Sequence, residues 1–314
     1  MKATVVISTW NRCESLRQTL AQMCRLRVPH RLEWELIVVN NNCTDATDDV
    51  IAAFGDRLPI RRVFEQKQGL SNGRNAAIAA AEGDLIIFTD DDVLVEPGWL
   101  AAYVEAAGRW PQAAFFGGRI LPEFESEPPD WMKSNLRLFR NMLGIRDLGS
   151  EEREFRGEET PFGGNMAFRC HVFDQGRFDP NFGRSGNGRI MADETALFLQ
   201  LAHNGKTGVW VPRAELKHYL PSTCFSRRYI WDYFLGQGRT QVRLHGTKNA
   251  KLLWGAPRYQ IRAFWVARLK SWILSPFYNK IAIRAFAKAA KTWGLIEESR
   301  GSRRVSHHFG KNST

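Results

Sequence analysis

The chain has 314 residues, 44% of them apolar and 25% charged, which is typical of a globular protein with a sizeable core and excludes a disordered chain. Five scattered cysteines without a CxxC pair argue against a disulfide framework and a structural zinc site. The net charge of +11 is uneven, because Tyr219–Thr314 carries 18 Lys/Arg against 3 Asp/Glu; such a basic tail is expected to meet an anionic partner.

The first part of the chain predicts alternating strands and helices. Strands are expected at Thr4–Ile7, Glu35–Val39, Ile60–Phe64 and Asp84–Phe88, and helices at Glu14–Leu26, Asp45–Phe54 and Asn72–Ala81. This alternation indicates right-handed βαβ units and a mostly parallel sheet, whose ligands bind at the carboxyl ends of the strands. The segments that follow the strands are polar and form the candidate binding loops: Ser8–Arg12, Asn40–Asp45, Gln66–Asn75 and Thr89–Asp92.

The second part of the chain has a less regular pattern. Residues 121–160 are charged and contain two adjacent prolines, which predicts a long irregular connection. The later elements expected are a strand at Phe162–Arg169, a helix at Asp193–Ala202, a strand at Gly208–Val211, a helix from Arg227, and two helices from Tyr259 onward separated by Pro276. In the last helix, Lys280, Arg284, Lys288 and Lys291 form a basic stripe, and Ile283, Phe286, Ala290 and Trp293 an apolar one.

Three adjacent carboxylates, Asp90, Asp91 and Asp92, follow the fourth expected strand. Such carboxylates repel one another unless a cation lies among them. Mg²⁺ or Mn²⁺ bridged to diphosphate oxygens would suit, because both are hard cations that prefer oxygen ligands. An isolated triplet would indicate a turn or a helix cap, but its position after a buried strand favours a metal site.

Two other loops have side chains suited to a nucleotide. The run Asn40–Asp45 supplies amides that can hydrogen-bond a base or a ribose, although Thr44 or Asp45 can instead cap the next helix. Gly69–Asn75 opens a helix whose N-terminus favours anions, and Arg74 can clamp a phosphate. Neither loop has the spacing of GxGxxG or of a Walker A motif, which argues against a dinucleotide or P-loop site.

Asp193 and Glu194 open an amphipathic helix with Leu197 and Leu201 on its core side. Acidic residues are common at the start of any helix, and a lone His such as His218 is more often structural than a ligand. Because Glu194 lies three residues before Leu197, it is expected to project toward the core side, whereas Asp193 is better placed to cap the helix.

Together and in this order, these motifs resemble family 2 glycosyltransferases of the GT-A fold, over roughly residues 3–240. VVISTWNR is similar to that family's first strand and nucleotide loop, ELIVVNNNCTDAT to its second-strand motif, GLSNGRNAAI to its helix start, and EGDLIIFTDDDVLVEPGWL to its DxD region. PFGGNMAFR, ADETALFLQLAHNG and VPRAELKH resemble the acceptor-side strand, the acidic base motif and the closing strand with His. Seven motifs in the right order are far more specific than any one of them.

The resemblance implies an α/β protein of GT-A type, with a mostly parallel nucleotide-binding sheet, flanking helices and a basic helical C-terminal extension. It implies a catalytic domain at residues 1–240, with a nucleotide-sugar-binding half at about 1–120 and an acceptor-binding half at 121–240, followed by the extension at 241–314. The implied reaction is inverting transfer of one sugar from a nucleotide diphosphate sugar to an acceptor hydroxyl. The processive signature Gln-x-x-Arg-Trp is missing, which favours single-sugar addition over polymer synthesis.

The resemblance also implies a role for each matching residue. A divalent metal, Mn²⁺ or Mg²⁺, would be held by Asp92, Asp90 and His218, and would stabilise the charge on the leaving diphosphate. Glu194 would take the proton of the acceptor hydroxyl, with Asp193 as the alternative base. The residues expected to contact the donor are Thr9, Asn11, Arg12, Asn41, Arg74, Asp90, Asp91, Gly164 and Asn165.

The expected acceptor is a glycan or a lipid-linked glycan of polysaccharide or glycoconjugate biosynthesis. The N-terminus has no pattern of a signal peptide, so we expect a cytoplasmic protein. Its segment Tyr259–Trp293 is expected either to lie on the anionic inner face of the membrane or to pack on the catalytic domain.

Three other functions are weaker interpretations of the same residues. A sugar-1-phosphate nucleotidyltransferase would have a Gly-rich loop after the first strand, where this chain has Ser8–Arg12. A nucleic-acid-binding protein would combine the basic tail with a recognisable motif or an aromatic ladder, which is lacking, so no nucleic-acid partner is expected. An inactive adaptor would have no need of the three Asp residues and Glu194.

Overall fold

The computed structural model describes residues 1–174, 176–182, 184–185, 188–189, 193–246, 251–274 and 280–309. The chain divides into two compact units. The first comprises Met1–Glu125, Leu143–Gly186 and Asp193–Leu220, and the second comprises Ser126–Met142, Asn187–Ala192 and Pro221–Thr314. The predicted boundary between residues 240 and 241 lies inside a helix of the second unit, α8 (Arg227–His245).

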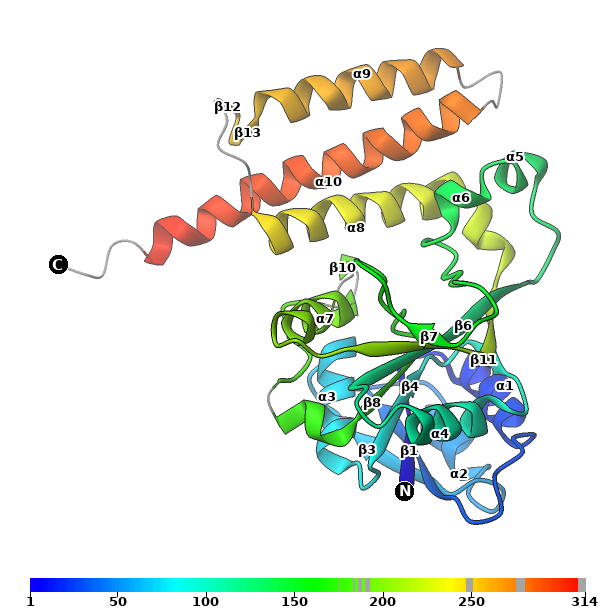
Figure 1. Cartoon of the computed structure of the whole chain (residues 1–314). Coiled ribbons are helices and arrows are strands. Elements are labelled where there is room, and N and C mark those ends of the chain that lie inside the picture. Colours follow the sequence, from blue (N-terminus) through cyan, green and yellow to red (C-terminus); the bar gives the residue numbers. More distant parts are fainter. Residues whose placement is uncertain are drawn as a thin grey trace. The chain divides into compact units, whose positions relative to one another are not determined.

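The first unit begins with the predicted alternation of parallel strands and helices (Figure 1). Strands β1 (Lys2–Thr9), β2 (Glu33–Asn40), β3 (Ile60–Phe64) and β4 (Leu85–Thr89) pair in parallel in the order β3-β2-β1-β4. Helices α1 (Cys13–Met23), α2 (Thr47–Ala52) and α3 (Leu70–Ala80) connect them. The predicted fold class is confirmed, because β-branched runs buried on both faces form the parallel part of an α/β sheet.

The second half of the same sheet is mixed. Strand β8 (Asn165–Arg169) runs antiparallel between β4 and β6 (Phe115–Phe124), and β6 pairs in parallel with β11 (Gly208–Leu220). Two short strands, β5 (Val93–Val95) and β7 (Arg153–Glu154), pair antiparallel with β11. Helices α4 (Trp99–Arg109) and α7 (Asp193–His203), the 3-10 helix η1 (Cys170–Asp174) and the short strand β9 (Arg184–Ser185) complete the elements of this unit, whereas β10 (Gly188–Arg189) belongs to the second unit.

The irregular connection predicted for residues 121–160 is only partly correct. This segment holds the end of β6, strand β7 and two short helices, α5 (Asp130–Lys133) and α6 (Leu136–Phe139). The strand predicted at Gly208–Val211 extends to Leu220, because β11 continues past an irregularity after Val211 and pairs along the rest of β6. The polar sequences of β7 and of the second part of β11 gave no strand pattern. These segments form strands because they pair with partners far away in the sequence.

Alternating side chains of the strands fill two apolar layers, one on each face of the sheet. One layer joins Val5, Leu36 and Ile87 to helices α1, α2 and α4. The other joins Val6 and Phe88 to helices α3 and α7 and to an aromatic cluster around Phe168. Burial on both faces fixes the strand register, so the polar ends of the strands are held at defined positions.

The second unit is helical. Helix α10 (Lys280–Phe309) packs against α8 and against α9 (Arg258–Leu274), and the unit also contains η2 (Ser222–Phe225) and the ribbon of β12 (Leu252–Leu253) and β13 (Ala256–Pro257). Gly238 and Gly294 allow α8 and α10 to approach closely, since a Cβ on Gly294 would lie 2.0 Å from the carbonyl oxygen of Leu235. Among the described residues, no helix is both long and apolar enough to cross a membrane.

Candidate functional site

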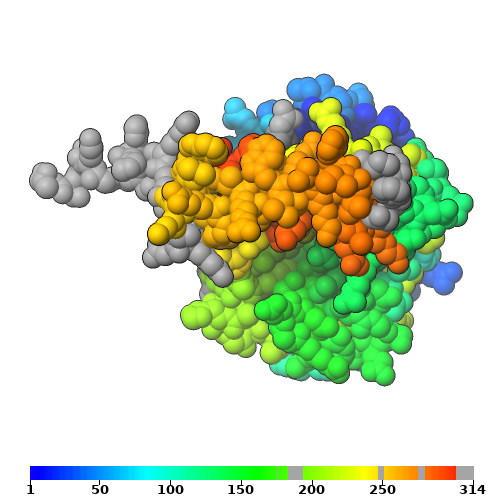
Figure 2. Space-filling model, turned by 90° about the horizontal axis from the view of Figure 1, so that it is seen from above, coloured from blue at the N-terminus to red at the C-terminus, as the bar shows by residue number. Residues whose placement is uncertain are grey.

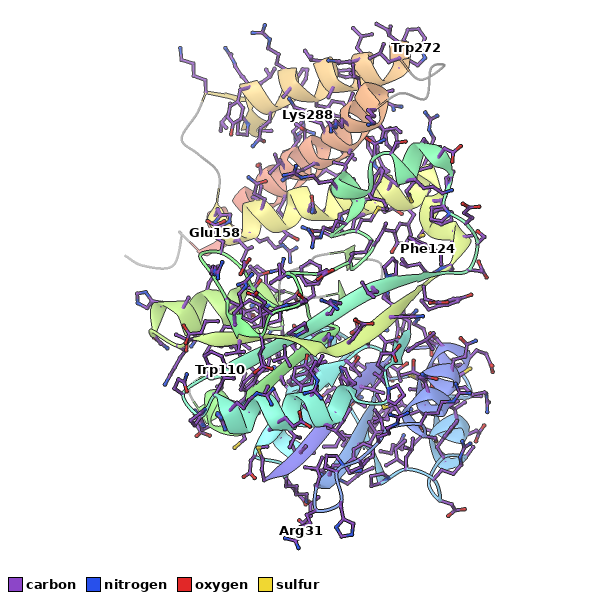
Figure 3. All side chains as sticks on the ribbon, turned by 45° about the vertical axis from the view of Figure 1, so that its right-hand side comes forward. Arg31, Trp110, Phe124, Glu158, Trp272 and Lys288 are labelled. Carbon is purple, nitrogen blue, oxygen red and sulfur yellow. The ribbon has the colours of Figure 1, made fainter. Side chains whose placement is uncertain are left out.

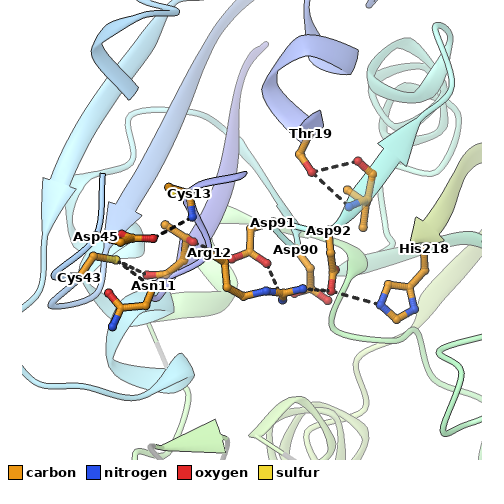
Figure 4. A network of polar contacts seen from close by, with 12 residues as sticks. Asn11, Arg12, Cys13, Thr19, Cys43, Asp45, Asp90, Asp91, Asp92 and His218 are labelled. Carbon is orange, nitrogen blue, oxygen red and sulfur yellow. Dashed lines mark hydrogen bonds and ion pairs between the residues drawn. The ribbon is translucent and has the colours of Figure 1, made fainter. Parts of the chain in front are cut away.

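The acidic triplet lies directly after β4, at the carboxyl end of the parallel strands, and Arg12 from the loop after β1 lies against it (Figure 4). Arg12 donates from Nη1 to Asp91 Oδ1 at 2.7 Å and from Nη2 to Asp92 Oδ2 at 2.8 Å. Thr9, the last residue of β1, donates from Oγ1 to Asp91 Oδ2 at 2.6 Å. The guanidinium of Arg12 is therefore a cation that offsets the repulsion within the triplet.

His218 approaches the triplet from the opposite side to Arg12 (Figure 4). The antiparallel pairing of β5 with β11 sets His218 opposite Val93, the residue after Asp92. Its Nε2 lies 3.4 Å from Asp92 Oδ2, and its Nδ1 lies 3.1 Å from the carbonyl oxygen of Leu143. Because a carbonyl oxygen can only accept, Nδ1 carries the proton of this bond and Nε2 faces the carboxylate.

Burial and charge act in opposite directions on these groups. Burial raises the pKa of Asp91 above its usual range, and the charge of Asp92 adds to the rise, while Arg12 and Thr9 oppose it. Burial also disfavours the charged form of Asp92, but His218 and Arg12 outweigh it and hold the pKa of Asp92 well below its usual range. Asp92 in turn raises the pKa of His218 against the effect of burial.

One oxygen of Asp92 is left over. Its Oδ2 serves both Arg12 and His218, whereas its Oδ1 is buried and has no hydrogen-bond partner among the described residues. A buried carboxylate oxygen without a partner costs free energy, because its desolvation is uncompensated. Among the described residues of the site, Oδ1 of Asp92 is thus a buried oxygen that could bind a cation.

The loops after β1 and β2 are joined by side chains. Asn11 adopts a left-handed backbone conformation, with φ of 51°, and its Oδ1 accepts from the backbone N of Thr44 at 2.7 Å. The carboxylate of Asp45 accepts from the first backbone N–H of α1, at Cys13, and from that of α2, at Thr47. These bonds fix the turn that carries Arg12, and they confirm that Asp45 serves a helix N-terminus.

The carboxylate of Asp90 lies close to Gly164 and to the guanidinium of Arg74. A Cβ on Gly164 would lie 2.6 Å from Asp90 Oδ2, so a larger residue at this position would force the carboxylate to shift. Arg74 is 4% exposed; its Nη2 lies 3.9 Å from Asp90 Oδ1 and donates to the carbonyl oxygen of Gly163 at 3.0 Å. Its guanidinium also lies over the ring of Phe178, 5.2 Å from the centroid. Arg74 thus supports Asp90 and the glycine pair from inside the protein.

The amides of Asn41 and Asn165 bind the protein itself. Asn41 donates to the carbonyl oxygens of Glu65 and Lys67 and accepts from the backbone N of Gly69, which holds the segment before α3. Asn165 is fully buried, and its amide makes four hydrogen bonds. The partners of Asn165 are Trp99, Tyr103, Arg119 and Ala214. These hydrogen bonds give both amides a structural role, and contact of Asn41 and Asn165 with the donor stays a prediction.

Helix α7 begins at Asp193, as the sequence predicts. Leu197, Phe198 and Leu201 are buried in the apolar layer over the sheet, which confirms the predicted core side. Glu194 is half-buried at the first turn of this helix. The side chain of Asp193 lies outside the described residues.

Two residues of this region had no signal in the sequence. Thr19 on α1 bonds through Oγ1 to both the backbone N and the carbonyl oxygen of Val93, which anchors the chain leaving the triplet. The carbonyl of Leu143 orients His218, and it lies in the segment predicted to be irregular. Neither could be found from local pattern, because each acts on a residue more than seventy positions away.

Residues 4–177 match the family described as "Glycosyl transferase family 2". The chain belongs to this family. This family 2 glycosyltransferase is 25% identical over 240 residues to the glucosyl-dolichyl phosphate glucuronosyltransferase of Haloferax volcanii, covering 75% of this chain and 73% of that protein. It is 26% identical over 253 residues to the succinoglycan biosynthesis protein ExoM of Rhizobium meliloti, covering 78% and 77%. Membership makes the protein a transferase and supersedes the nucleotidyltransferase and nucleic-acid-binding alternatives.

Solved structures agree on the fold. The mannosyltransferase PcManGT of Pyrobaculum calidifontis, in complex with GDP-Man and Mn²⁺, superposes with a TM-score of 0.58 at 15% identity, covering 99% of this chain and 76% of that one. Residues 1–349 of TarS from S. aureus, in complex with UDP-GlcNAc, give a TM-score of 0.55 at 14% identity, covering 98% and 92%. At these identities the likeness concerns the fold.

Proposed function

We propose that this glycosyltransferase moves a single sugar from a nucleotide diphosphate sugar to an acceptor hydroxyl, with inversion and with a divalent metal ion. The observation that carries the proposal is Oδ1 of Asp92, which is buried and has no hydrogen-bond partner in the described part of the chain, in an acidic triplet at the carboxyl end of the parallel strands. A relative in fold was solved with GDP-Man and Mn²⁺, which supports the same donor class and metal here.

The residues present fit a metal that the donor completes. Among the described residues, no three His, Cys, Asp or Glu side chains form a ready-made metal site. Mg²⁺ and Mn²⁺ at nucleotide sites commonly take only one or two carboxylates and fill their remaining positions with phosphate oxygens and water. Asp92 through Oδ1 is the proposed main ligand, His218 through Nε2 the second, and Asp90 lies beside them. When bound, the ion would neutralise charge that develops on the leaving diphosphate.

The donor is proposed to lie over the loops after β1 and β4. Thr9 and Arg12 hold Asp91 and Asp92 in place, and Arg12 is itself half exposed, so its guanidinium can turn to a phosphate. Asp90 and Asp91 are proposed to face the ribose and the ligands of the metal. Gly164 lets the chain pass close to Asp90, where a larger residue would displace the carboxylate. Asn11 keeps the turn before Arg12 in shape.

Glu194 is the proposed catalytic base. The acceptor hydroxyl must lose its proton as it attacks the anomeric carbon from the side opposite the diphosphate, and an ionised carboxylate can accept it. Glu194 is half-buried at the start of a helix whose next turns are anchored in the core, which holds its backbone firmly. The acceptor class proposed is a glycan or a lipid-linked glycan, and the proposed location is the cytoplasmic side of a membrane.

A screen of nucleotide sugars tests the donor and metal proposal. The purified chain is incubated with UDP-, GDP- and dTDP-sugars, with Mn²⁺, Mg²⁺ or a chelator, and donor binding and slow hydrolysis are measured. We expect one donor class to bind, and to bind only weakly in the chelator. Binding that is equally tight with and without metal would contradict the metal proposal.

Kinetics on a pair of neighbouring variants tests the base. Glu194→Gln is expected to lower kcat by about 10²- to 10⁴-fold while donor affinity stays the same, because the amide keeps the shape but accepts no proton. Asp193→Asn, which removes the same charge one residue earlier, is the matched control and is expected to affect stability more than turnover. Near-normal turnover of Glu194→Gln would refute the assignment.

A further inference from the structure

Helix α9 presents a row of large apolar side chains to solvent. Five of them are between 54% and 73% exposed: Trp265, Val266, Leu269, Trp272 and Ile273, here called the α9 face. Their spacing places them on one side of the last turns of the helix. In Figure 2 the side chains of α9, in orange, form the surface nearest the viewer, and Trp272 is labelled at the outer side of α9 in Figure 3.

The opposite side of α9 is the one that packs. Ile261, Phe264 and Ala267 are buried in the helical core of the second unit, and the ring of Phe264 lies 4.9 Å from that of Trp293 on α10. The α9 face is thus a second apolar side on a helix whose first apolar side is already used. Single exposed apolar residues are ordinary, whereas a contiguous group of this kind marks a binding surface.

The charged residues that α9 itself places around the α9 face are all positive. Arg262 lies one turn before it, and Arg268 and Lys270 flank it on its two sides. Helix α9 contains no acidic residue, and the stretch Lys280–Gly294 of α10 contains none either. The nearest acidic residues along the chain are paired, since Glu297 binds Arg239 at 2.7 Å and Glu298 binds Arg243 at 2.7 Å. Within the described part of α9, the surface therefore combines an apolar centre with a basic rim, although Arg268 also lies over the ring of Trp231, 5.7 Å from its centroid.

We propose that the α9 face docks on the surface of an anionic lipid bilayer. Tryptophan and aliphatic side chains enter the boundary between headgroups and acyl chains, and Arg and Lys on the rim reach the phosphates. A second copy of this chain would suit the apolar centre but would set the like-charged rims of two α9 helices together, which disfavours self-association. Anionic lipid satisfies both the centre and the rim.

The sequence suggests the whole segment Tyr259–Trp293, which holds both α9 and the apolar stripe of α10, as a membrane contact. The rings of the α10 stripe pack within the helical unit: Phe286 lies 5.4 Å from Trp231, and Trp293 contacts Phe264. The membrane contact is therefore assigned to the α9 part of this segment. It goes beyond the proposed function and does not depend on it, although docking would bring the enzyme to a lipid-linked acceptor.

Vesicle flotation with the full chain tests the proposal. The vesicles contain equal parts of phosphatidylglycerol and phosphatidylcholine, or phosphatidylcholine alone, at about 0.15 M salt. We expect the chain to float with the anionic vesicles and not with the neutral ones. Leu269→Ser and Trp272→Ser are each expected to weaken this binding about tenfold, and the double variant Arg262→Glu/Lys270→Glu by more.

Matched variants elsewhere provide the control. Leu199 on α7 is 54% exposed and Leu269 is 56% exposed, so Leu199→Ser removes an equivalent side chain from outside the α9 face and is expected to leave flotation unchanged. Arg31→Glu/Lys206→Glu reverses the same number of charges at exposed positions of the first unit, and the same result is expected. Melting temperatures show that each variant is folded.

Two results would overturn the proposal. One is a chain that stays at the bottom with anionic vesicles. The other is flotation that the α9 variants leave as it was. Analytical ultracentrifugation tests whether a second copy of the chain covers the α9 face instead. A chain that does not float, and whose dimer Leu269→Ser converts to a monomer, would assign the α9 face to self-association. None of these readouts depends on sugar transfer, so failure here is distinct from failure of the proposed activity.

Discussion

Replacing Asp92 by Asn is the sharpest test of the metal proposal. The amide keeps the shape of the carboxylate, so a hydrogen bond from Arg12 can persist. The substitution removes the negative charge of the carboxylate, whose Oδ1 has no partner among the described residues and is the proposed metal ligand. A neutral amide is a much poorer ligand for a hard divalent ion than a carboxylate. The variant is therefore expected to bind the donor as if the metal were absent.

The structure also sets the magnitudes of this prediction. Mn²⁺ should strengthen donor binding in the natural chain, and we measure this effect as the donor Kd without metal divided by the donor Kd with Mn²⁺. In Asp92→Asn we expect this ratio to be smaller by a factor of at least about 100, which corresponds to a loss of about 2.8 kcal/mol of metal-dependent binding free energy. The loss of stability should be small, about 1 kcal/mol, because Arg12 is half exposed and its ion pair with Asp92 is screened. The repulsion between Asp91 and Asp92 is relieved at the same time, which offsets part of this loss.

Isothermal titration calorimetry with the donor identified in the screen, with and without Mn²⁺, measures the ratio. Asp91→Asn is the matched control, because it removes the same charge from the adjacent residue, whose two oxygens are already bonded to Thr9 and Arg12. The control is expected to weaken donor binding while the metal still strengthens it. A metal effect that is intact in Asp92→Asn would refute the reasoning, and so would its loss in Asp91→Asn alone.

Three further predictions concern stability. Asn165→Ala should lower the free energy of unfolding by about 3 kcal/mol or more in urea titration, because four hydrogen bonds of this fully buried side chain lose their partner; a cost below about 1 kcal/mol would contradict its structural role. Gly294→Ala should destabilise the helical unit by about 2 kcal/mol, since its new methyl group would meet the carbonyl oxygen of Leu235. Thermal unfolding followed by circular dichroism measures this, and an unchanged melting temperature would show that the helices move apart at no cost. The pair of Arg153 and Glu159 should stabilise the fold by about 1 kcal/mol at neutral pH. Its hydrogen bonds with Arg153 lower the pKa of Glu159 from 4.5 to about 2, so this stabilisation is complete above pH 4.5 and is lost as the pH falls through about 2. Glu159→Gln should therefore be less stable than the natural chain at pH 7 and equally stable only at a pH well below 2, and a difference independent of pH would contradict the ion-pair account.

The parallel half of the fold could be predicted because its signals are local. Apolar runs such as Val5–Ile7 and Leu85–Phe88 are buried on both faces, so their sequence alone marks them as interior strands. The polar loops that follow them must meet at one edge of the sheet, because parallel strands all end there. The place of the acidic triplet directly after such a run therefore assigns it to the binding edge.

The mixed half was harder to predict because its strands depend on distant partners. Strand β5 has only three residues, and the polar part of β11 forms a strand because it pairs with β6 and β5. Such pairing leaves little trace in the local pattern, since it depends on hydrogen bonds to other segments. The position of His218 beside Asp92 follows from this pairing and from the carbonyl of Leu143.

The sequence by itself determined the family, the parallel sheet and the identity of the acidic edge, because these depend on residue order and on local hydrophobic period. Tertiary structure decided how each polar group is used. It sets Arg12 among the carboxylates, engages the amides of Asn41 and Asn165 inside the protein, and leaves one oxygen of Asp92 without a partner among the residues that the structure describes. It also decided that α10 is packed while α9 keeps an apolar face in solvent, because a helical period shows that a helix has an apolar side but not what covers it.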